Sequence, residues 1–398
     1  MALQIPVFGI IEFLYRQQPG FSPTITPYDV RIFFNAATAV LAAQWPYCDF
    51  FFPYPPLSLL FLIPPRLIAG DPGAYFAWFK VELLFLDWIG LMAMAWIARQ
   101  IGQPLGRTLL VYSCALPALG SIVLQRYDLV PAILVLLALA TWMRGWHFAT
   151  WALLAVGTLT KIYPSLLIPL FTVGEWRAAG WRAVGRGWSI FVALVLCGLL
   201  PFLLVAFGET LNVFGAQTGR GLEIESTFAL MLLAGRFFGL PAEVVYNSGL
   251  NTWEVTSPSS NLFYLTALGL QVILLIFVYL RFFRLARGTN DTIVRYSAVT
   301  IAIGLLTSRV FSPQFMLWLF PLPFLSGDRK FAWASLLFLV SALLTQAAYP
   351  FLWSALKQAS AIPVGVLLLR DATLGLLCML LVQGPPKPDV PELHSGTS

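Results

Sequence analysis

The chain has 398 residues, of which 59% are hydrophobic and only 11% are charged, and its formal net charge is +6. Because soluble domains carry about 25% charged residues, this composition excludes a soluble globular protein and indicates a polytopic membrane protein. The basic residues are spread over short segments between apolar stretches, as the positive-inside rule expects, which argues against a nucleic-acid partner. Four cysteines without paired spacing and two histidines support neither a disulfide framework nor a zinc site.

Apolar stretches recur along almost the whole length, so the sequence predicts one all-α integral membrane domain over residues 1–383. The remaining residues, 384–398, read as a short, polar, disordered tail on the cytoplasmic side. The first apolar segment, "MALQIPVFGIIEFLYR", is shorter than the ~20 residues that a spanning helix needs.

A long connection follows, over about residues 16–74. Its stretch "TPYDVRIFFNAATAVLAAQ" has the apolar spacing of an interfacial amphipathic helix. The run over 55–69 is apolar but interrupted by prolines and too short to span, so it predicts a re-entrant or interfacial segment. The aromatic stretch "DFFFPYPP" fits either an interfacial anchor or a surface that stacks on sugars or lipid tails.

The next segment, 75–98, predicts a spanning helix that carries three charged residues, Lys80, Glu82 and Asp87. Lys80 and Asp87 are seven positions apart and therefore share one face of the helix. Because a charge inside the membrane is costly unless it is paired, we expect an internal ion pair between these two side chains.

Three apolar segments farther along carry their only charges at their midpoints. These segments run over 108–143, 148–174 and 296–326, and their midpoints read "LQRYDLVP", "TKIYP" and "TSRVFSPQF". Basic clusters flank each segment, and if all of these clusters are cytoplasmic, each segment crosses the membrane an even number of times. The pattern then predicts three hairpins that place Arg126, Lys161 and Arg309 at one outer face.

Lys161 is the sharpest of these signals. An ammonium at the centre of a bilayer costs at least ~2.5 kcal/mol, so an intramembrane lysine is a functional-site hypothesis. Pro164 disfavours helical geometry at Tyr163, which predicts a chain break there. The limbs are short for a ~30 Å core, so the apex is expected in a protein-lined cavity. The alternative is one tilted helix through 148–174.

A second long connection, over about 208–261, contains "GAQTGRGLEIES" and adds Arg220, Glu223 and Glu225 to the same face. Cations recessed at an interface suit a lipid phosphate, and a phosphate leaving a sugar carbon develops charge that lysine and arginine stabilise. One carboxylate then suffices as base for an acceptor hydroxyl. The structural alternatives are a local ion pair between Arg126 and Asp128, and ordinary loop charges at Arg220 and Asp49.

Several of these stretches, taken together and in order, resemble a known group of enzymes. They are "PYDVRIFFNAATAVLAAQWPYCDFFFPYPPLSLL", "FKVELLFLD", "TKIYPSLLIPL", "GRGLEIES" and "SRVFSPQFMLW". Over about residues 20–380, the chain resembles the polyprenyl-phosphate-sugar-dependent GT-C glycosyltransferases. It is most similar to the glycosyltransferase 87 family of bacterial mannosyltransferases, which is related to the catalytic subunit of GPI mannosyltransferase I.

The resemblance implies a GT-C bundle of about 10–13 transmembrane or re-entrant helices with two long outer loops. It also implies transfer of a hexose, mannose above all, with inversion, from polyprenyl phosphate to a glycolipid or glycan acceptor. The enzyme is then expected in the cytoplasmic (inner) membrane, with its active site on the extracytoplasmic side and the bilayer as its environment.

The family pattern assigns roles by position. Asp29 matches the catalytic base of the first outer loop. The expected donor phosphate and sugar contacts are Lys161, Tyr163, Arg126, Arg309 and Gln314. The expected acceptor or donor contacts, Arg220, Glu225 and Asp128, are inferred instead from their charge and from the membrane face on which they lie. Related enzymes often carry an Asp-x-Asp pair in this loop, but Pro27 occupies the first position here. A lone carboxylate is a poor magnesium site, so we expect neither a metal nor another cofactor.

A secondary transporter or lipid flippase is the main rival, because transporters also hold ionisable residues within the membrane. Lys80, Glu82 and Asp87 keep that reading open. The chain shows no evident internal repeat, and two long outer connections with acidic residues suit an active site better than a gated path. A non-catalytic membrane scaffold is a third reading, but it gives no reason for three cations at hairpin apexes.

Overall fold

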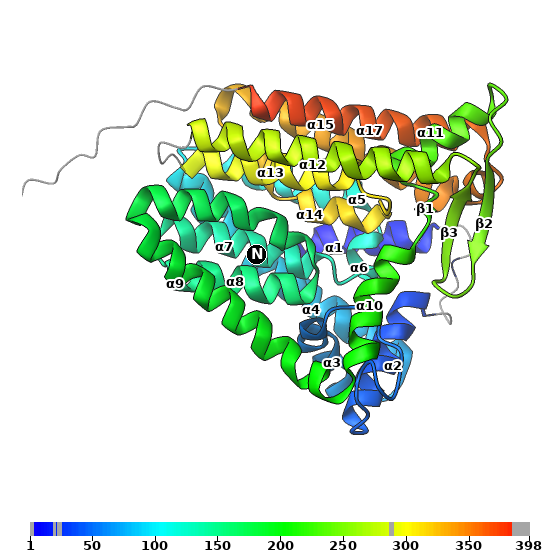
Figure 1. Ribbon diagram of the computed structural model, residues 1–398, viewed down its shortest axis with the longest axis horizontal. Helices are drawn as coiled ribbons and strands as arrows, with labels where there is room; N and C mark the ends of the chain where they lie inside the picture. The colour runs from blue at the N-terminus through cyan, green and yellow to red at the C-terminus, as the bar shows by residue number, and fades with distance from the viewer. Residues whose placement is uncertain (1–3, 19–20, 22–25, 286–289, 384–398) are drawn as a thin grey trace, which may run out of the picture.

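A computed structural model describes residues 4–18, 21, 26–285 and 290–383, so the predicted polar tail 384–398 lies outside the described residues. The described chain is mostly helical, and Figure 1 shows two groups of helices with a small sheet at one end. One group contains α12, α15 and α17, and the other contains α7, α8 and α9.

The elements follow one another along the chain in a mostly helical order. They are α1 (Gln4–Arg16), α2 (Tyr28–Leu41), η1 (Pro56–Ser58), α3 (Leu59–Ile68), α4 (Pro72–Gln100), α5 (Leu105–Leu119), α6 (Ile122–Gln125), α7 (Leu129–Met143), α8 (His147–Thr160), η2 (Tyr163–Leu167), α9 (Ile168–Val205), α10 (Phe207–Gly219), β1 (Leu222–Glu223), α11 (Thr227–Arg236), β2 (Glu243–Asn247), β3 (Thr252–Thr256), α12 (Ser260–Leu285), α13 (Asn290–Leu306), η3 (Pro313–Phe315), α14 (Met316–Leu319), η4 (Leu322–Leu325), α15 (Asp328–Gln346), η5 (Ala347–Phe351), α16 (Trp353–Lys357) and α17 (Ala361–Val382).

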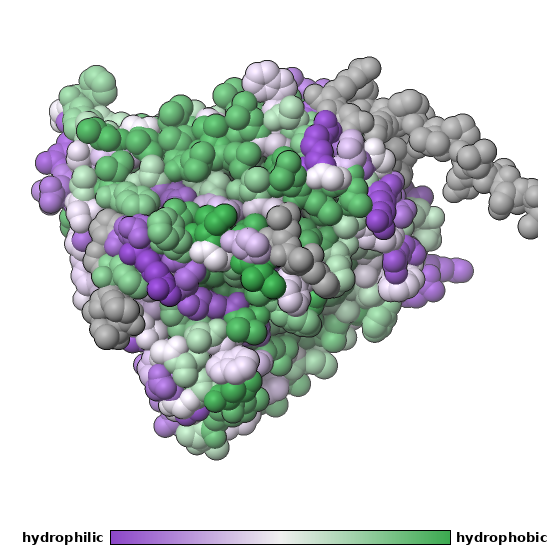
Figure 2. All heavy atoms as spheres, turned by 180° about the vertical axis from the view of Figure 1, so that it is seen from behind, coloured by the Kyte–Doolittle hydropathy of each residue, from purple (hydrophilic) through white to green (hydrophobic). Residues whose placement is uncertain are grey.

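Membrane-spanning character is clear from length and composition. Among the described residues, five helical segments are long and apolar enough to cross a bilayer, namely Pro72–Gln100, Tyr163–Val205, Ser260–Leu285, Lys330–Phe351 and Ala361–Val382. Helix α12 exposes Leu262, Leu265 and Ile273, which is typical of a lipid-facing surface. In Figure 2 one face is largely hydrophobic, with hydrophilic residues gathered mainly at two opposite ends and in one patch between them. The predicted all-α polytopic membrane fold is confirmed.

The predicted break in the 148–174 segment is present. Helix α8 ends at Thr160, Lys161 has extended backbone angles, and the chain resumes at η2 and α9. The Lys161 amide still donates to the Gly157 carbonyl (2.8 Å), so the helix is completed before the chain turns. The alternative of one continuous helix is therefore wrong.

The other two apexes also interrupt the helices. Arg126 lies in an extended conformation between α6 and α7, and Arg309 lies between α13 and η3. The third hairpin differs from the simplest expectation, because its returning limb consists of the short turns η3, α14 and η4 rather than one helix. Prolines at 313, 321 and 323 explain this, since proline lacks the amide that a continuous helix needs.

The second outer connection contains a small sheet that the sequence analysis did not predict. The central strand of this sheet is β3, which pairs antiparallel with β1 on one side and with β2 on the other. Val255 of β3 lies opposite Leu222 of β1 and opposite Val244 of β2. A second apolar core covers the sheet, in which Leu222 and Val255 are buried together with Leu232 of α11 and Leu367 of α17. The sheet is therefore anchored to the membrane helices.

The first outer connection has the predicted elements, a helix at α2 and a short, proline-containing segment at η1 and α3. The predicted ion pair within α4 is wrong. Lys80 pairs instead with Glu12 of α1 (Nζ to Oε2, 2.9 Å), and Asp87 accepts a hydrogen bond from the Tyr112 hydroxyl of α5 (2.7 Å). Lys80 and Asp87 are thus each bound to a neighbouring helix, whereas Glu82 Oε2 and Asp87 Oδ2 have no hydrogen-bond partner among the described residues.

Candidate active site

A cavity of about 1090 Å³ lies where the two outer connections meet the three hairpin apexes. Its lining includes Asp29 from α2, Arg126 and Lys161 from the first two apexes, and Arg309 from the third. Glu223 and Glu225 line it from β1 and the residues that follow. Five segments far apart in the sequence thus place charged side chains around one space.

Asp29 forms an ion pair with Arg126. Asp29 lies in the first turn of α2, where the helix dipole favours a negative charge, and Pro27 immediately precedes this helix. Both side chains are about one fifth exposed, so the pair faces the cavity while remaining partly shielded from water. The sequence analysis placed both residues in one site but did not predict that they pair.

Lys161 forms an ion pair with Asp128 (Nζ to Oδ1, 3.1 Å). The Trp318 indole donates to the same carboxylate oxygen (2.8 Å), and the Tyr127 ring lies 4.6 Å from the ammonium. The local pair that the sequence allowed between Arg126 and Asp128 is therefore wrong, because Arg126 reaches Asp29 and Asp128 reaches Lys161. These cross-pairs join the first hairpin to α2 and to the second hairpin.

Aromatic rings line the cavity next to Lys161. Tyr163 stacks on Trp318 with ring centroids 4.3 Å apart, and Phe315 stacks on Trp318 at 3.9 Å. Gln314, adjacent to Phe315, also lines the cavity. Stacked rings with a nearby amide can hold both the apolar face and the hydroxyls of a sugar.

Arg309 connects the third apex to the second outer connection. Its guanidinium donates to the Arg220 carbonyl (3.0 Å) and to the Tyr264 hydroxyl (3.0 Å). Its own carbonyl accepts from the Glu223 amide (2.9 Å). Arg309 therefore fixes the backbone on which Arg220 and Glu223 are carried, besides lining the cavity.

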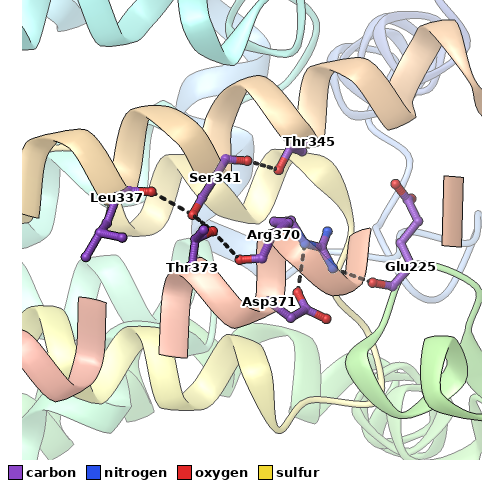
Figure 3. Close-up of polar contacts among 7 residues, drawn as sticks. All are labelled: Glu225, Leu337, Ser341, Thr345, Arg370, Asp371 and Thr373. Atoms are coloured by element: carbon purple, nitrogen blue, oxygen red, sulfur yellow. Dashed lines mark hydrogen bonds and ion pairs between the residues drawn. The ribbon is translucent and has the colours of Figure 1, made fainter. Parts of the chain in front are cut away.

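The two glutamates are held by different partners. Ser312 donates to Glu223 Oε1 (2.5 Å), whereas Arg370 of α17 donates to the backbone carbonyl of Glu225 (2.6 Å). Figure 3 shows the Arg370 guanidinium between that carbonyl and Asp371, with the Glu225 carboxylate directed away from it. Burial raises the pKa of both glutamates, and the neighbouring Glu223 raises that of Glu225 further.

The structure brings the predicted site residues together. Asp29, Arg126, Lys161, Tyr163, Arg220, Glu225, Arg309 and Gln314 all line the cavity, and buried Asp128 lies behind Lys161. Asp49 is an exposed loop acid that accepts from the Trp45 amide, which agrees with the structural reading of that residue. The chemical roles assigned to the nine residues stay predictions.

Sequence reasoning assigned no role to several residues of the site, namely Glu223, Ser312, Trp318, Tyr349 and Arg370. Glu223 and Glu225 are two positions apart, the spacing that places side chains on one side of an extended segment, so "LEIE" contained a usable signal. Among the described residues, no three histidine, cysteine, aspartate or glutamate side chains converge as metal ligands do. Metal independence nevertheless stays a prediction.

Comparison with known proteins gives the family. The model of glycosyltransferase family 87 matches residues 51–313, about two thirds of the chain. The chain belongs to this family. The prediction from the sequence motifs is thereby confirmed, and the protein is a membrane glycosyltransferase. No curated protein matches the chain in sequence.

Solved structures support the fold independently. The crystal structure of ArnT from Cupriavidus metallidurans bound to undecaprenyl phosphate matches with a TM-score of 0.51 and 16% identity, covering 96% of this chain and 77% of ArnT. The apo structure of the same enzyme matches with the same values. At this identity the match shows the fold alone, and it confirms the expected GT-C architecture.

Proposed function

We propose that this family 87 glycosyltransferase moves a hexose, mannose first of all, from a polyprenyl phosphate to a glycolipid or glycan acceptor. The observation that supports it most is the pairing of Asp29 with Arg126 beside Lys161 with Asp128 on one cavity. Together these groups offer a base and two cations, which is the set that this transfer requires.

The reaction is a single displacement with inversion. Asp29 accepts the proton of the acceptor hydroxyl, the acceptor oxygen forms a bond to the anomeric carbon, and the bond from that carbon to the phosphate oxygen breaks. Polyprenyl phosphate leaves as an anion. Because phosphate is a good leaving group, no second carboxylic acid is needed to protonate it, unlike in ordinary glycoside hydrolysis.

Lys161 and Arg126 would bind the phosphate as its negative charge develops. Interactions that strengthen in the transition state accelerate the reaction more than those made equally with the substrate. Both cations are already paired with carboxylates, so the donor phosphate competes with Asp29 and Asp128 for them. Release of Asp29 from Arg126 on donor binding would free that carboxylate to act as the base.

A polyprenyl donor is supported by two findings of different kinds. The cavity lies in a protein whose candidate spanning helices expose apolar side chains, and this setting suits a donor that carries a lipid chain. The structural neighbour ArnT was crystallised with undecaprenyl phosphate bound. We place the active site on the extracytoplasmic face of the cytoplasmic membrane, on the basis of the positive-inside rule.

Sugar transfer in membranes tests this proposal. Radiolabelled polyprenyl-phosphate mannose is given to membranes that contain the wild type, Asp29→Asn or the matched control Asp49→Asn at equal expression. We expect label in a glycolipid or glycan product with the wild type and with Asp49→Asn, and none with Asp29→Asn. Transfer by Asp29→Asn at the wild-type rate would disprove the assignment of the base.

The rival reading, a transporter or flippase, makes a different prediction. It requires movement of a lipid or solute across the bilayer without a new glycosidic bond. Lys80, Glu82 and Asp87 kept that reading open. Lys80 and Asp87 are bound to other helices, and none of the three is among the residues that line the cavity. Family membership likewise favours transfer. Flipping of labelled lipid in vesicles, with no glycosylated product, would revive the rival.

A further inference from the structure

Two buried carboxylate oxygens in the cavity wall accept no hydrogen bond from the described residues. They are Oε2 of Glu223 and Oε1 of Glu225. Glu225 is only 3% exposed, so water at the surface does not explain its orphaned oxygen. Buried polar atoms of this kind nearly always have a partner in a folded protein, which makes the pair a place where a ligand group is expected.

The surrounding residues hold both glutamates in place without neutralising them. Backbone hydrogen bonds fix the segment on both sides, from the Ile224 amide to the Trp253 carbonyl (2.9 Å) and from the Ser226 amide to the Glu223 carbonyl (2.8 Å). Arg370, which is fully buried, binds Asp371 (2.8 Å) and the Glu225 backbone carbonyl rather than the Glu225 side chain.

A further chain of hydrogen bonds supports Arg370 from behind. Thr373 donates to the Arg370 carbonyl (2.7 Å) and contacts Ser341 of α15 (2.6 Å). Figure 3 shows this chain running from α15 through α17 to Glu225. The backbone at Glu225 is thus anchored in the membrane domain, and Glu225 is also among the residues that line the cavity, an arrangement that pre-forms a binding group.

The chemistry of the pair selects against a phosphate and in favour of hydroxyls. Carboxylates repel an anion, so the donor phosphate belongs near Lys161 and Arg126. Burial raises the pKa of Glu223 and Glu225, although Arg220, Arg370 and Arg126 oppose the shift. Carboxyl oxygens accept hydrogen bonds from hydroxyl groups, and a carboxyl that is protonated also donates one, so the pair suits the hydroxyls of a sugar, which both donate and accept.

We propose that Glu223 and Glu225 form a sugar-hydroxyl subsite of the cavity, which takes the hexose ring of a substrate, and that Ser312 and Arg370 position it. The inference rests on the proposed function and deepens it, because it names the residues that bind the hydroxyls of the sugar. Arg126, which pairs with Asp29, lines the same cavity as Glu223 and Glu225. A hexose held by the glutamates therefore lies beside the reacting groups.

Binding measurements that do not depend on catalysis test the subsite. The dissociation constants of polyprenyl-phosphate mannose and of bare polyprenyl phosphate are compared in detergent for the wild type, Glu225→Gln and Glu225→Ala. The exposed Glu243→Gln of β2 is the matched control. A second arm measures binding of methyl mannoside, a hexoside without phosphate, in the presence of bare polyprenyl phosphate.

If the subsite takes the donor sugar, the wild type and Glu243→Gln bind the mannosylated lipid more tightly than the bare lipid. Loss of one hydrogen bond to a charged or strongly polar group typically weakens binding roughly 10- to 100-fold. Glu225→Ala should therefore remove most of the preference while leaving the affinity for bare polyprenyl phosphate unchanged, and Glu225→Gln should have a smaller effect. If the subsite takes the acceptor sugar, the same loss appears in the methyl mannoside arm.

Unchanged affinity of Glu225→Ala in both arms would overturn the subsite. That outcome differs from failure of the proposed function, in which the wild type binds neither form of the lipid and transfers no mannose. For Ser312, the readout is the same preference for the mannosylated lipid. Ser312→Ala should lower it and Ser312→Thr, which keeps the hydroxyl, should restore it, whereas a merely structural role would change thermal stability without changing the preference.

Discussion

The two sides of the cavity differ in how their buried carboxylates are paired. On one side, which we call the ion-paired wall, Asp29 pairs with Arg126 and Asp128 pairs with Lys161. On the other, the carboxylate wall, Glu223 and Glu225 each keep an oxygen that accepts no hydrogen bond from the described residues, and buried Arg370 binds Asp371 and the Glu225 backbone carbonyl. Paired charges are stable in an empty site, whereas unpartnered oxygens gain stability only when a ligand arrives.

Because of this difference, we expect the two walls to bind different parts of the substrate. On the ion-paired wall a substrate anion must exchange with an existing carboxylate, so binding and activation of the base are coupled. On the carboxylate wall a sugar hydroxyl replaces nothing and simply satisfies a buried group. A site that is built to bond a hydroxyl discriminates strongly against a substrate without it, which makes the carboxylate wall the natural place for sugar selectivity.

The largest expected effect is a fall in kcat when the base of the ion-paired wall, Asp29, is replaced. Asp29→Asn removes the proposed base and leaves its geometry nearly intact, so kcat should fall by roughly 10²- to 10⁴-fold, the usual contribution of a general base. Mannose transfer under saturating donor measures it. The Asp49→Asn variant should keep kcat within about twofold, because Asp49 is exposed and accepts a hydrogen bond from the nearby Trp45 amide. Equal losses in both variants would mean that the outer loop, not one carboxylate, matters.

Lys161→Met tests whether the ion-paired wall is a balanced unit. It leaves Asp128 buried without its cation, and breaking a buried pair typically costs about 3–5 kcal/mol in the free energy of unfolding. The double variant Lys161→Met/Asp128→Asn should regain most of this stability, since the neutral amide no longer needs the lysine. Donor affinity should stay low in both variants. Recovery of donor affinity in the double variant would limit Lys161 to a structural role.

The contribution of the carboxylate wall to protein stability should change with pH in the opposite direction to that of a salt-bridged acid, whose pKa is lowered in the folded state. Because the pKa of Glu225 is raised in the folded state, the folded protein holds a proton that the unfolded chain releases, so stability is highest at low pH and falls as pH rises. Thermal unfolding in detergent at about pH 5 and about pH 8 measures this loss, given the ordinary glutamate pKa of about 4.3. Glu225→Gln should flatten the dependence, whereas Glu243→Gln should not.

Local features of the sequence were enough to predict the breaks and the cations of the site, whereas the role of Asp29 and the inclusion of Gln314 came from the family resemblance. Pro164 and the isolated Lys161 mark an interrupted helix without knowledge of any other segment. The same holds for the amphipathic spacing of α2 and for the charges that meet around the cavity. These signals depend on near neighbours in the chain, which a single sequence displays directly.

Partners could not be predicted in the same way, because they come from distant elements. Asp128 is paired with Lys161 of another hairpin, and Arg126 reaches α2 rather than its near neighbour Asp128. The sheet in the second connection was missed because its strands are short and become buried only against α11 and α17. The partner of Lys80 is also on a distant element, because it is Glu12 of α1 rather than a residue of its own helix.

The pair between Lys80 and Glu12 gives the smallest expected effect and a control for the whole comparison. Both side chains are about one quarter exposed, and ion pairs of this kind contribute only about 0–1 kcal/mol. Glu12→Gln should therefore change the free energy of unfolding by less than about 1 kcal/mol and leave mannose transfer unaffected, because Glu12 and Lys80 lie outside the cavity lining. Thermal unfolding and the transfer assay measure the two quantities in one preparation. A loss of transfer in Glu12→Gln as large as that of Lys161→Met would show that charge pairing throughout the protein, rather than the position of a pair on the cavity, controls the reaction.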